Sequence, residues 1–297
     1  NNTTLSILDS RFTENQALVT PGKEYLSAVG GAVFNSYAVA TAAGEMDTLI
    51  ANTEFTGNYA DNAGAAIQQS FGFITINNSL ITENLVGTSG SGIHNSFGQM
   101  TVHQSTISNN KSLGNGSGIS NNGTLLLSES TVAGNIATYF GGGVYISSDG
   151  TTTISNSTLS GNQSARDGGA LYANTNQPLS IINTTITGNS AVRGGGIRAD
   201  NVIPALTNSI IAGNTADLEP QLYSNYTNVN SIVQDSIVGL LDPVLRDNGG
   251  PTKTHALLPG SAAIDAGDNT AATAAGLTTD QRGESSSRIV DGTVDIG

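Results

Sequence analysis

Along most of the chain, apolar and polar residues alternate in short stretches that are separated by polar turns. In NTTITGNSAVRGGGI (residues 183–197), Ile186 lies between Thr185 and Thr187, and the i, i+3, i+4 spacing of an amphipathic helix is missing. A period of two places successive side chains on opposite faces of a strand. The stretch therefore predicts a short strand that leads into a glycine-rich turn.

A seven-residue unit that ends in asparagine recurs through the chain, with variants such as DSRFTEN, NSLITEN, NSTLSGN and NTTITGN. After the first unit it returns about every 26 residues. The closing residues of the units are Asn15, Asn58, Asn84, Asn110, Asn135, Asn162, Asn189 and Asn214. We expect these side chains to form a buried ladder at a corner of the fold, with amides bonded from one repeat to the next and a left-handed backbone at each asparagine.

Two further apolar positions accompany the units. The aliphatic residues that stand two positions before a unit are Ile7, Ile50, Ile76, Val102, Leu127, Ile154, Ile181 and Leu206. After the closing asparagine, a small residue precedes Val33, Ile67, Ile93, Ile119, Val144, Leu171 and Ile197. Each repeat thus predicts three short strands with inward aliphatic residues, and a sustained period without crossover helices predicts an all-β parallel β-helix, a solenoid of about eight coils.

The first coil and the end of the chain depart from the repeat. Two insertions, at residues 16–29 around PGKEYL and 36–47 around ATAAGEMD, lengthen the first coil and predict either functional loops or an end cap. The repeat decays after Asn214, and the composition changes near Asp235. We therefore divide the chain into β-helix repeats over residues 1–234 and a different C-terminal segment over residues 235–297.

Composition excludes several classes of function. The net charge is −13 with ten Lys and Arg residues, which argues against nucleic acid as a partner. The chain has no cysteine, so neither a disulfide framework nor a thiolate metal site can form. No apolar run approaches the roughly 20 residues of a membrane span. The glycine runs lack the long helix of a phosphate-binding fingerprint, so we assign them to tight corners and close packing between coils.

Outward columns in the later coils carry aromatic and basic residues. The positions beside the second anchor are Phe34, Gln68, His94, Ser120, Tyr145, Tyr172 and Arg198, and Tyr139, Arg166 and Arg193 each follow a closing asparagine by four residues. Aromatic faces suit sugar rings, and guanidinium groups suit carboxylates or sulfates. The candidate glycan-binding residues are Tyr139, Tyr145, Arg166, Tyr172, Arg193 and Arg198, with ordinary surface decoration as the alternative.

Two other functions are consistent with the repeat. A polysaccharide lyase or glycoside hydrolase needs acidic groups beside a base or a second carboxylate, and Asp167, Arg193 and Asp200 are the residues we would assign to catalysis. Hydroxyl residues flank an inward aliphatic residue in TIS (106–108), TLS (158–160) and TIT (185–187). Stacked coils would turn these into a flat array similar to that of ice-binding solenoids.

The sequence predicts no cofactor and no metal site. The histidines His94, His103 and His255 are not spaced as a ligand set, and we expect His94 and His103 to lie on different faces of one coil, facing solvent. A calcium ion held by loops near Asp265, Asp268 and Asp280 is the alternative.

The C-terminal segment resembles a known family. LLDPVLRDNGGPTKTHALLPGSAAIDAGD (240–268), TDQRG (279–283) and VDGTVDIG (290–297) are similar to the bacterial choice-of-anchor Q domain, and the upstream repeats resemble pectate-lyase-like β-helices and polymorphic outer-membrane protein repeats. The resemblance implies a right-handed parallel β-helix, export, and attachment or release at the cell surface through a sorting signal that varies between members. No such signal follows residue 297, so we expect the anchor to have been removed or to lie beyond this chain. The resemblance carries no catalytic residues, and we expect its shared segment to cap the end of the last coils.

Together these observations predict a secreted or bacterial cell-surface protein, structural or adhesin-like, that binds glycans. The expected partners are polysaccharide or cell-surface and matrix components, with end-to-end or lateral self-association and without nucleic acid or a membrane span.

Overall fold

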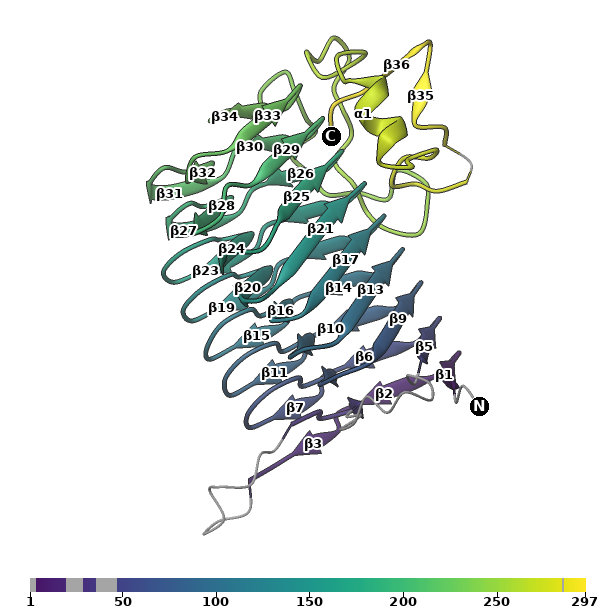
Figure 1. The fold of residues 1–297 in the computed structure, drawn as a ribbon, viewed down its shortest axis with the longest axis vertical. Helices are drawn as coiled ribbons and strands as arrows, with labels where there is room; N and C mark the ends of the chain where they lie inside the picture. The colour runs from purple at the N-terminus through teal and green to yellow at the C-terminus, as the bar shows by residue number, and fades with distance from the viewer. Residues whose placement is uncertain (1–3, 20–28, 36–46, 285) are drawn as a thin grey trace.

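The computed structural model describes residues 4–19, 29–35, 47–284 and 286–297, and these form an all-β parallel β-solenoid (Figure 1). The fold class predicted from the repeat is therefore confirmed. The insertions around PGKEYL and ATAAGEMD lie outside the described residues, apart from their flanks. Each full coil adds one strand to each of four parallel sheets.

The first two sheets each hold nine strands within the described residues. The first sheet contains β1 (Thr4–Leu8), β5 (Asp47–Ala51), β9 (Phe73–Asn77), β13 (Gln99–His103), β17 (Thr124–Ser128), β21 (Thr151–Ser155), β25 (Leu179–Ile182), β29 (Ala205–Thr207) and β33 (Thr227–Val229). The second sheet contains β2 (Arg11–Thr13), β6 (Glu54–Thr56), β10 (Leu80–Thr82), β14 (Thr106–Ser108), β18 (Thr131–Ala133), β22 (Thr158–Ser160), β26 (Thr185–Thr187), β30 (Ile210–Ala212) and β34 (Ile232–Gln234).

The other two sheets hold eight strands each in the same part of the chain. The third sheet contains β3 (Gln16–Ala17), β7 (Tyr59–Ala60), β11 (Leu85–Val86), β15 (Lys111–Ser112), β19 (Ile136–Ala137), β23 (Gln163–Ser164), β27 (Ser190–Arg193) and β31 (Thr215–Leu218). The fourth sheet contains β4 (Val33–Asn35), β8 (Ile67–Gln69), β12 (Ile93–Asn95), β16 (Ile119–Asn121), β20 (Val144–Ser148), β24 (Leu171–Thr175), β28 (Ile197–Asp200) and β32 (Leu222–Tyr223).

We predicted three strands per coil, but each full coil has four. The strand that the sequence did not reveal is the short one that follows each ladder asparagine in the third sheet. Most of these strands have two residues, which is too short for the alternation that identifies a strand in a sequence.

The coils stack in register, so equivalent residues form columns. In the first sheet Ile50 pairs with Ile76, which pairs with Val102, and the three are fully buried. The predicted inward aliphatic residues of the first, second and fourth sheets join one continuous core along the solenoid. A single coil could not bury these side chains by itself, so the stability of the rod is collective.

The closing asparagines form a continuous buried ladder. The Asn135 side chain donates from Nδ2 to Oδ1 of Asn162 (2.9 Å), and Asn162 donates in the same way to Asn189 (3.0 Å). The main-chain N–H of Asn135 also donates to Oδ1 of Asn162 (3.1 Å), and Nδ2 of Asn162 donates to the carbonyl oxygen of Val132 (2.9 Å). Each side chain thus satisfies main-chain groups that the corner leaves unpaired.

The left-handed backbone lies one residue earlier than expected. Positive φ occurs at Gly161 (64°) and Gly188 (68°), directly before the ladder residues, and at Asn156 and Asn183 at the start of the same units. Glycine and asparagine tolerate this conformation best, which explains both ends of the N-x-x-x-x-G-N pattern. The ladder asparagines themselves are retained for their side-chain hydrogen bonds.

The C-terminal segment packs on the side of the rod. It contains α1 (Asn269–Ala274) and the antiparallel pair β35 (Ile289–Val290) and β36 (Thr293–Val294). Figure 1 shows this yellow segment beside the later coils. We expected a cap over the end of the last coil, but its hydrogen bonds reach back along the second sheet as far as Glu129 and Thr131. The outward face of that sheet carries Ile210 and Ala212 there, and the segment buries them in a second, smaller core.

We expect Asn162→Ala to lower the free energy of unfolding by about 2 to 3 kcal/mol, because the main-chain and side-chain N–H groups of Asn135 would lose their buried acceptor and the carbonyl oxygen of Val132 would lose a donor. Thermal denaturation followed by circular dichroism would measure the loss. Gln163→Ala, at the exposed neighbouring position, is the matched control and should leave the melting temperature nearly unchanged. Equal melting temperatures for both variants would contradict a stabilising role of the ladder.

Candidate functional site

Stacking of the coils brings the six candidate glycan-binding residues to one corner of the rod, between the third and fourth sheets. Tyr145 of β20, Tyr172 of β24 and Arg198 of β28 form one column. Beside it, Phe140, Asp167 and Arg193 form a second column through parallel bridges. The cluster predicted from spacing therefore exists as a spatial group.

The aromatic residues of this group pack mainly against one another. The Tyr172 ring stacks with Tyr145, with 5.7 Å between ring centroids, and with Phe140 at 4.8 Å. Its hydroxyl donates to Oδ2 of Asp200 (2.9 Å), and burial, followed by this hydrogen bond, raises the pKa of Tyr172. Since only 7% of Tyr172 is exposed, its ring stabilises the stack and cannot serve as a platform for a sugar.

Both candidate catalytic carboxylates are held by arginines. The Arg193 guanidinium donates to both carboxylate oxygens of Asp167, each at 2.7 Å, and the Asp167 side chain is 4% exposed. Arg198 donates to Asp200 at 2.9 and 3.2 Å. The hydrogen bonds to Asp167 raise the pKa of Arg193, as expected for a stable pair. Asp167 and Asp200 thus each form an ion pair, with Arg193 and Arg198 respectively.

The register of Arg193 differs from the prediction. Spacing from the ladder placed it in one column with Tyr139 and Arg166, but it pairs with Asp167 instead. The reason is that the left-handed Gly194 follows Asn189 by five positions, whereas the equivalent Gly168 follows Asn162 by six. The one-residue difference moves Arg193 next to a carboxylate.

Tyr139 and Arg166 are the exposed part of the group, and we call them the Tyr139 corner. Tyr139 is 42% exposed, and the Arg166 guanidinium carbon lies 4.9 Å from the centroid of its ring. Val192, also exposed, lies in the adjoining coil, where its N–H donates to the carbonyl oxygen of Arg166 (2.7 Å). Within the described part of the chain, Arg166 makes no ion pair. This corner combines an aromatic face with an unpaired cation.

The histidines are less exposed than predicted. His94 lies between Gln68 and Ser120 in the fourth sheet, and its buried Nδ1 has no hydrogen-bond partner. Burial lowers the pKa of His94 to about 4 and also lowers the pKa of His255. His94 is half-buried rather than fully open to solvent, and its column neighbours Gln68 and Ser120 are buried.

Among the described residues, no group of three or more His, Asp or Glu side chains is placed to hold a metal ion. Asp268 caps α1 by accepting from the N–H groups of Thr270 and Ala271. Asp280 pairs with Arg282. The loops that we considered for calcium therefore use these carboxylates for other contacts.

The hydroxyl array is not an open surface in the later coils. Thr158, Ser160, Thr185 and Thr187 are buried beneath the C-terminal segment. The Thr158 hydroxyl donates to Oε1 of Gln281 (2.7 Å), and the amide of Gln281 donates to Thr131 (3.0 Å). These contacts remove the flat exposed array on which the ice-binding hypothesis depended.

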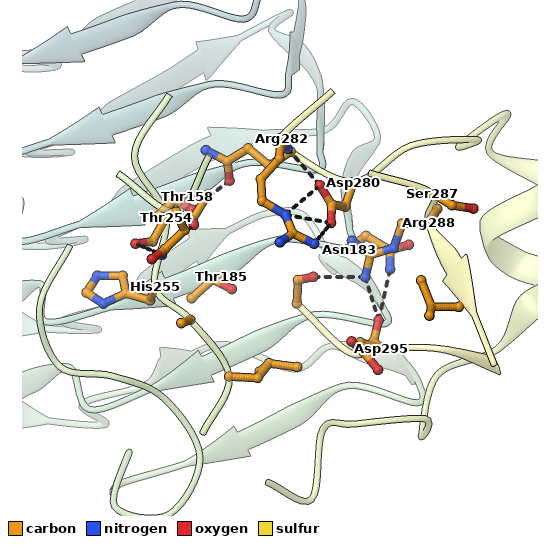
Figure 2. Close-up of a pocket in the computed structure, with 16 residues that line it drawn as sticks. Thr158, Asn183, Thr185, Thr254, His255, Asp280, Arg282, Ser287, Arg288 and Asp295 are labelled. Carbon is orange, nitrogen blue, oxygen red and sulfur yellow. Dashed lines mark hydrogen bonds and ion pairs between the residues drawn. The ribbon is translucent and has the colours of Figure 1, made fainter. Parts of the chain in front are cut away.

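A cavity of about 300 Å³ lies between the second sheet and the C-terminal segment, and the repeat gave no sign of it. Figure 2 shows the Arg282 guanidinium near its middle, with Asp280 on one side and Thr185 and His255 on the other. The residues of the segment that line the cavity lie within or near the phrases DNGGPTKTHALLPGS, TDQRG and VDGTVDIG. Those phrases were the available sequence signal for the cavity. They did not reveal which residues of the solenoid the segment would contact.

We expect acidification to destabilise the protein partly through His94. Because its pKa is below the ordinary value, the unfolded chain takes up the proton first as the pH falls from about 6.5 towards 4, and stability is lost in that window. His94→Gln, which matches Gln68 in the same column, should reduce the loss of unfolding free energy between pH 7 and 4.5 by about 2 kcal/mol. Denaturant titrations at each pH would measure it, and parallel pH profiles for both proteins would contradict it.

Comparisons with known proteins support the repeat architecture. Residues 156–174 match the Chlamydia polymorphic membrane protein repeat family, and this stretch covers β22, β23 and most of β24. No curated protein and no solved structure matches the chain. No helix in the described residues is both long and apolar enough to cross a membrane. The repeat match and the stacked parallel sheets together identify a β-helix repeat protein.

Proposed function

We propose that this is an adhesin-like β-helix protein displayed at a bacterial cell surface or released from it, and that it binds glycans at the Tyr139 corner. The match to a membrane-protein repeat supports a surface location. The resemblance of the C-terminal phrases to the choice-of-anchor Q domain supports export. The expected partners are polysaccharides or other cell-surface and matrix components.

The exposure of Tyr139 beside Arg166, which has no ion pair among the residues that the structure describes, carries the glycan proposal. The C–H groups of a sugar ring pack favourably on exposed aromatic surface, and the Arg166 guanidinium, which lies over the Tyr139 ring, can bind a carboxylate or sulfate substituent. Arg166 is one of ten basic residues in a chain of net charge −13, so an accessible cation at this corner is uncommon on this surface. We therefore propose an acidic glycan.

The other two functions have no such support. A glycosidase or lyase would need a free carboxylate at Asp167 or Asp200, and each is bonded to an arginine. An ice-binding face would need open hydroxyl columns, and those of the later coils are buried.

A glycan array with the purified protein tests the proposal. We expect Tyr139→Ala and Arg166→Ala each to weaken binding to acidic glycans about threefold to tenfold, through loss of roughly 1 kcal/mol of stacking or charge interaction. Tyr226→Ala removes a comparably exposed tyrosine elsewhere and is the control. Arg166→Lys keeps the charge and should retain part of the binding. Failure to bind any glycan, or binding unchanged in both corner variants, would refute the assignment.

A further inference from the structure

The cavity beneath the C-terminal segment has the properties of a second binding site. One wall is the outward face of the second sheet, and the others are two stretches of the segment that are distant in sequence (Figure 2). The residues that line the cavity include Thr185, Asn248, Leu257, Arg282 and Val290. A volume of about 300 Å³ is at the lower end of ligand pockets, so the occupant would be small.

The charged groups around the cavity already compensate one another. Nη2 and Nε of Arg282 donate to Oδ2 of Asp280 at 2.5 and 3.0 Å. Burial lowers the pKa of Arg288, although the nearby carboxylates of Asp280 and Asp295 favour its charged form. Its Nη2 donates to the main-chain oxygen of Asp295 (2.6 Å). Arg282 is thus paired with Asp280, and Arg288 lies within the electrostatic influence of Asp280 and Asp295, so the site does not require a charged ligand.

His255 adds no charge at neutral pH. One ring nitrogen lies 2.8 Å from the Ser160 hydroxyl oxygen, and the other lies 2.8 Å from the carbonyl oxygen of Asp242. Burial lowers its pKa, which favours the neutral ring. Both ring nitrogens of His255 already have hydrogen-bond partners, so the side chain contributes to the shape of the cavity wall.

Several polar atoms of the cavity keep unused hydrogen-bonding capacity. Among the described residues, Nη1 of Arg282, Oγ1 of Thr185 and Oδ1 of Asn248 have no partner, although the other polar atoms of Arg282 and Asn248 do. The Arg282 nitrogen can donate a hydrogen bond to a ligand, the Thr185 hydroxyl can donate and accept, and the Asn248 oxygen can accept. The side chains of Leu257 and Val290 provide apolar surface next to them.

We propose that this cavity binds a single neutral sugar ring. A pyranose presents hydroxyl groups at its edge and C–H groups on its faces, which matches mixed donors and acceptors beside an aliphatic wall. Its small size and lack of charge fit the volume and the compensated charges. The site is separate from the Tyr139 corner and does not depend on the function proposed for that corner.

Isothermal titration of the 297-residue protein with glucose, galactose, mannose and N-acetylglucosamine tests the site, with glucuronate as the charged probe. We expect saturable binding of at least one neutral sugar. Thr185→Val replaces only the hydroxyl and should weaken that binding about tenfold, the effect of one lost hydrogen bond of about 1.4 kcal/mol. Thr187→Val is the matched control, since Thr187 lies two residues further along β26, equally buried but outside the cavity lining.

Val290→Phe provides a second variant, because Val290 is exposed at the cavity and a larger ring there should occupy it without disturbing the core. Loss of sugar binding in Val290→Phe, with the melting temperature of the wild type retained, supports the site. Binding that survives in both Thr185→Val and Val290→Phe overturns it, as does the absence of any neutral-sugar binding to folded protein. Glucuronate binding at least tenfold tighter than every neutral sugar overturns the ligand class.

Tyr139→Ala separates this site from the corner proposed above. The variant should bind the neutral sugar as the wild type does. If Tyr139→Ala alone abolishes the binding, the sugar occupies the Tyr139 corner and the cavity proposal is wrong.

Discussion

In-register stacking of one coil on the next is the constraint on which the rest of this structure depends. Main-chain hydrogen bonds fix neighbouring strands about 4.8 Å apart, so every position in a coil meets its equivalent in the next. Corners would break this arrangement unless their main-chain groups found partners. The buried asparagine ladder supplies them, and a left-handed glycine, asparagine or glutamate before each ladder residue turns the chain.

Stacking also decides what the outward side chains do. Tyr172 looks like a binding residue in the sequence, but the columns place Tyr145 and Phe140 against its ring. Asp167 looks like a catalytic acid, but the next coil brings Arg193 to it. Interactions between coils therefore convert most of the cluster into a stabilising network, whereas Tyr139 and Arg166 are exposed.

The C-terminal segment uses the outward face of the solenoid as a second core. Ile210 and Ala212 face outward in β30, where solvent would otherwise surround them, and the segment buries them. Gln281 links β18 and β22 through Thr131 and Thr158. The cavity around Arg282 forms because the segment covers this face incompletely. One face thus provides both an attachment surface and a candidate binding site.

The repeated period determined most of the coil by itself. The aliphatic columns that include Ile76 and Val102, and the ladder positions such as Asn162, could be read from spacing because every coil obeys the same local rule. The strands of the third sheet were too short to show a pattern. Only the tertiary structure decided the partner of Arg193 and the burial of Thr158, because one depends on a one-residue change in a corner and the other on a contact with Gln281, 123 positions along the chain. Neither leaves a periodic signal in the sequence.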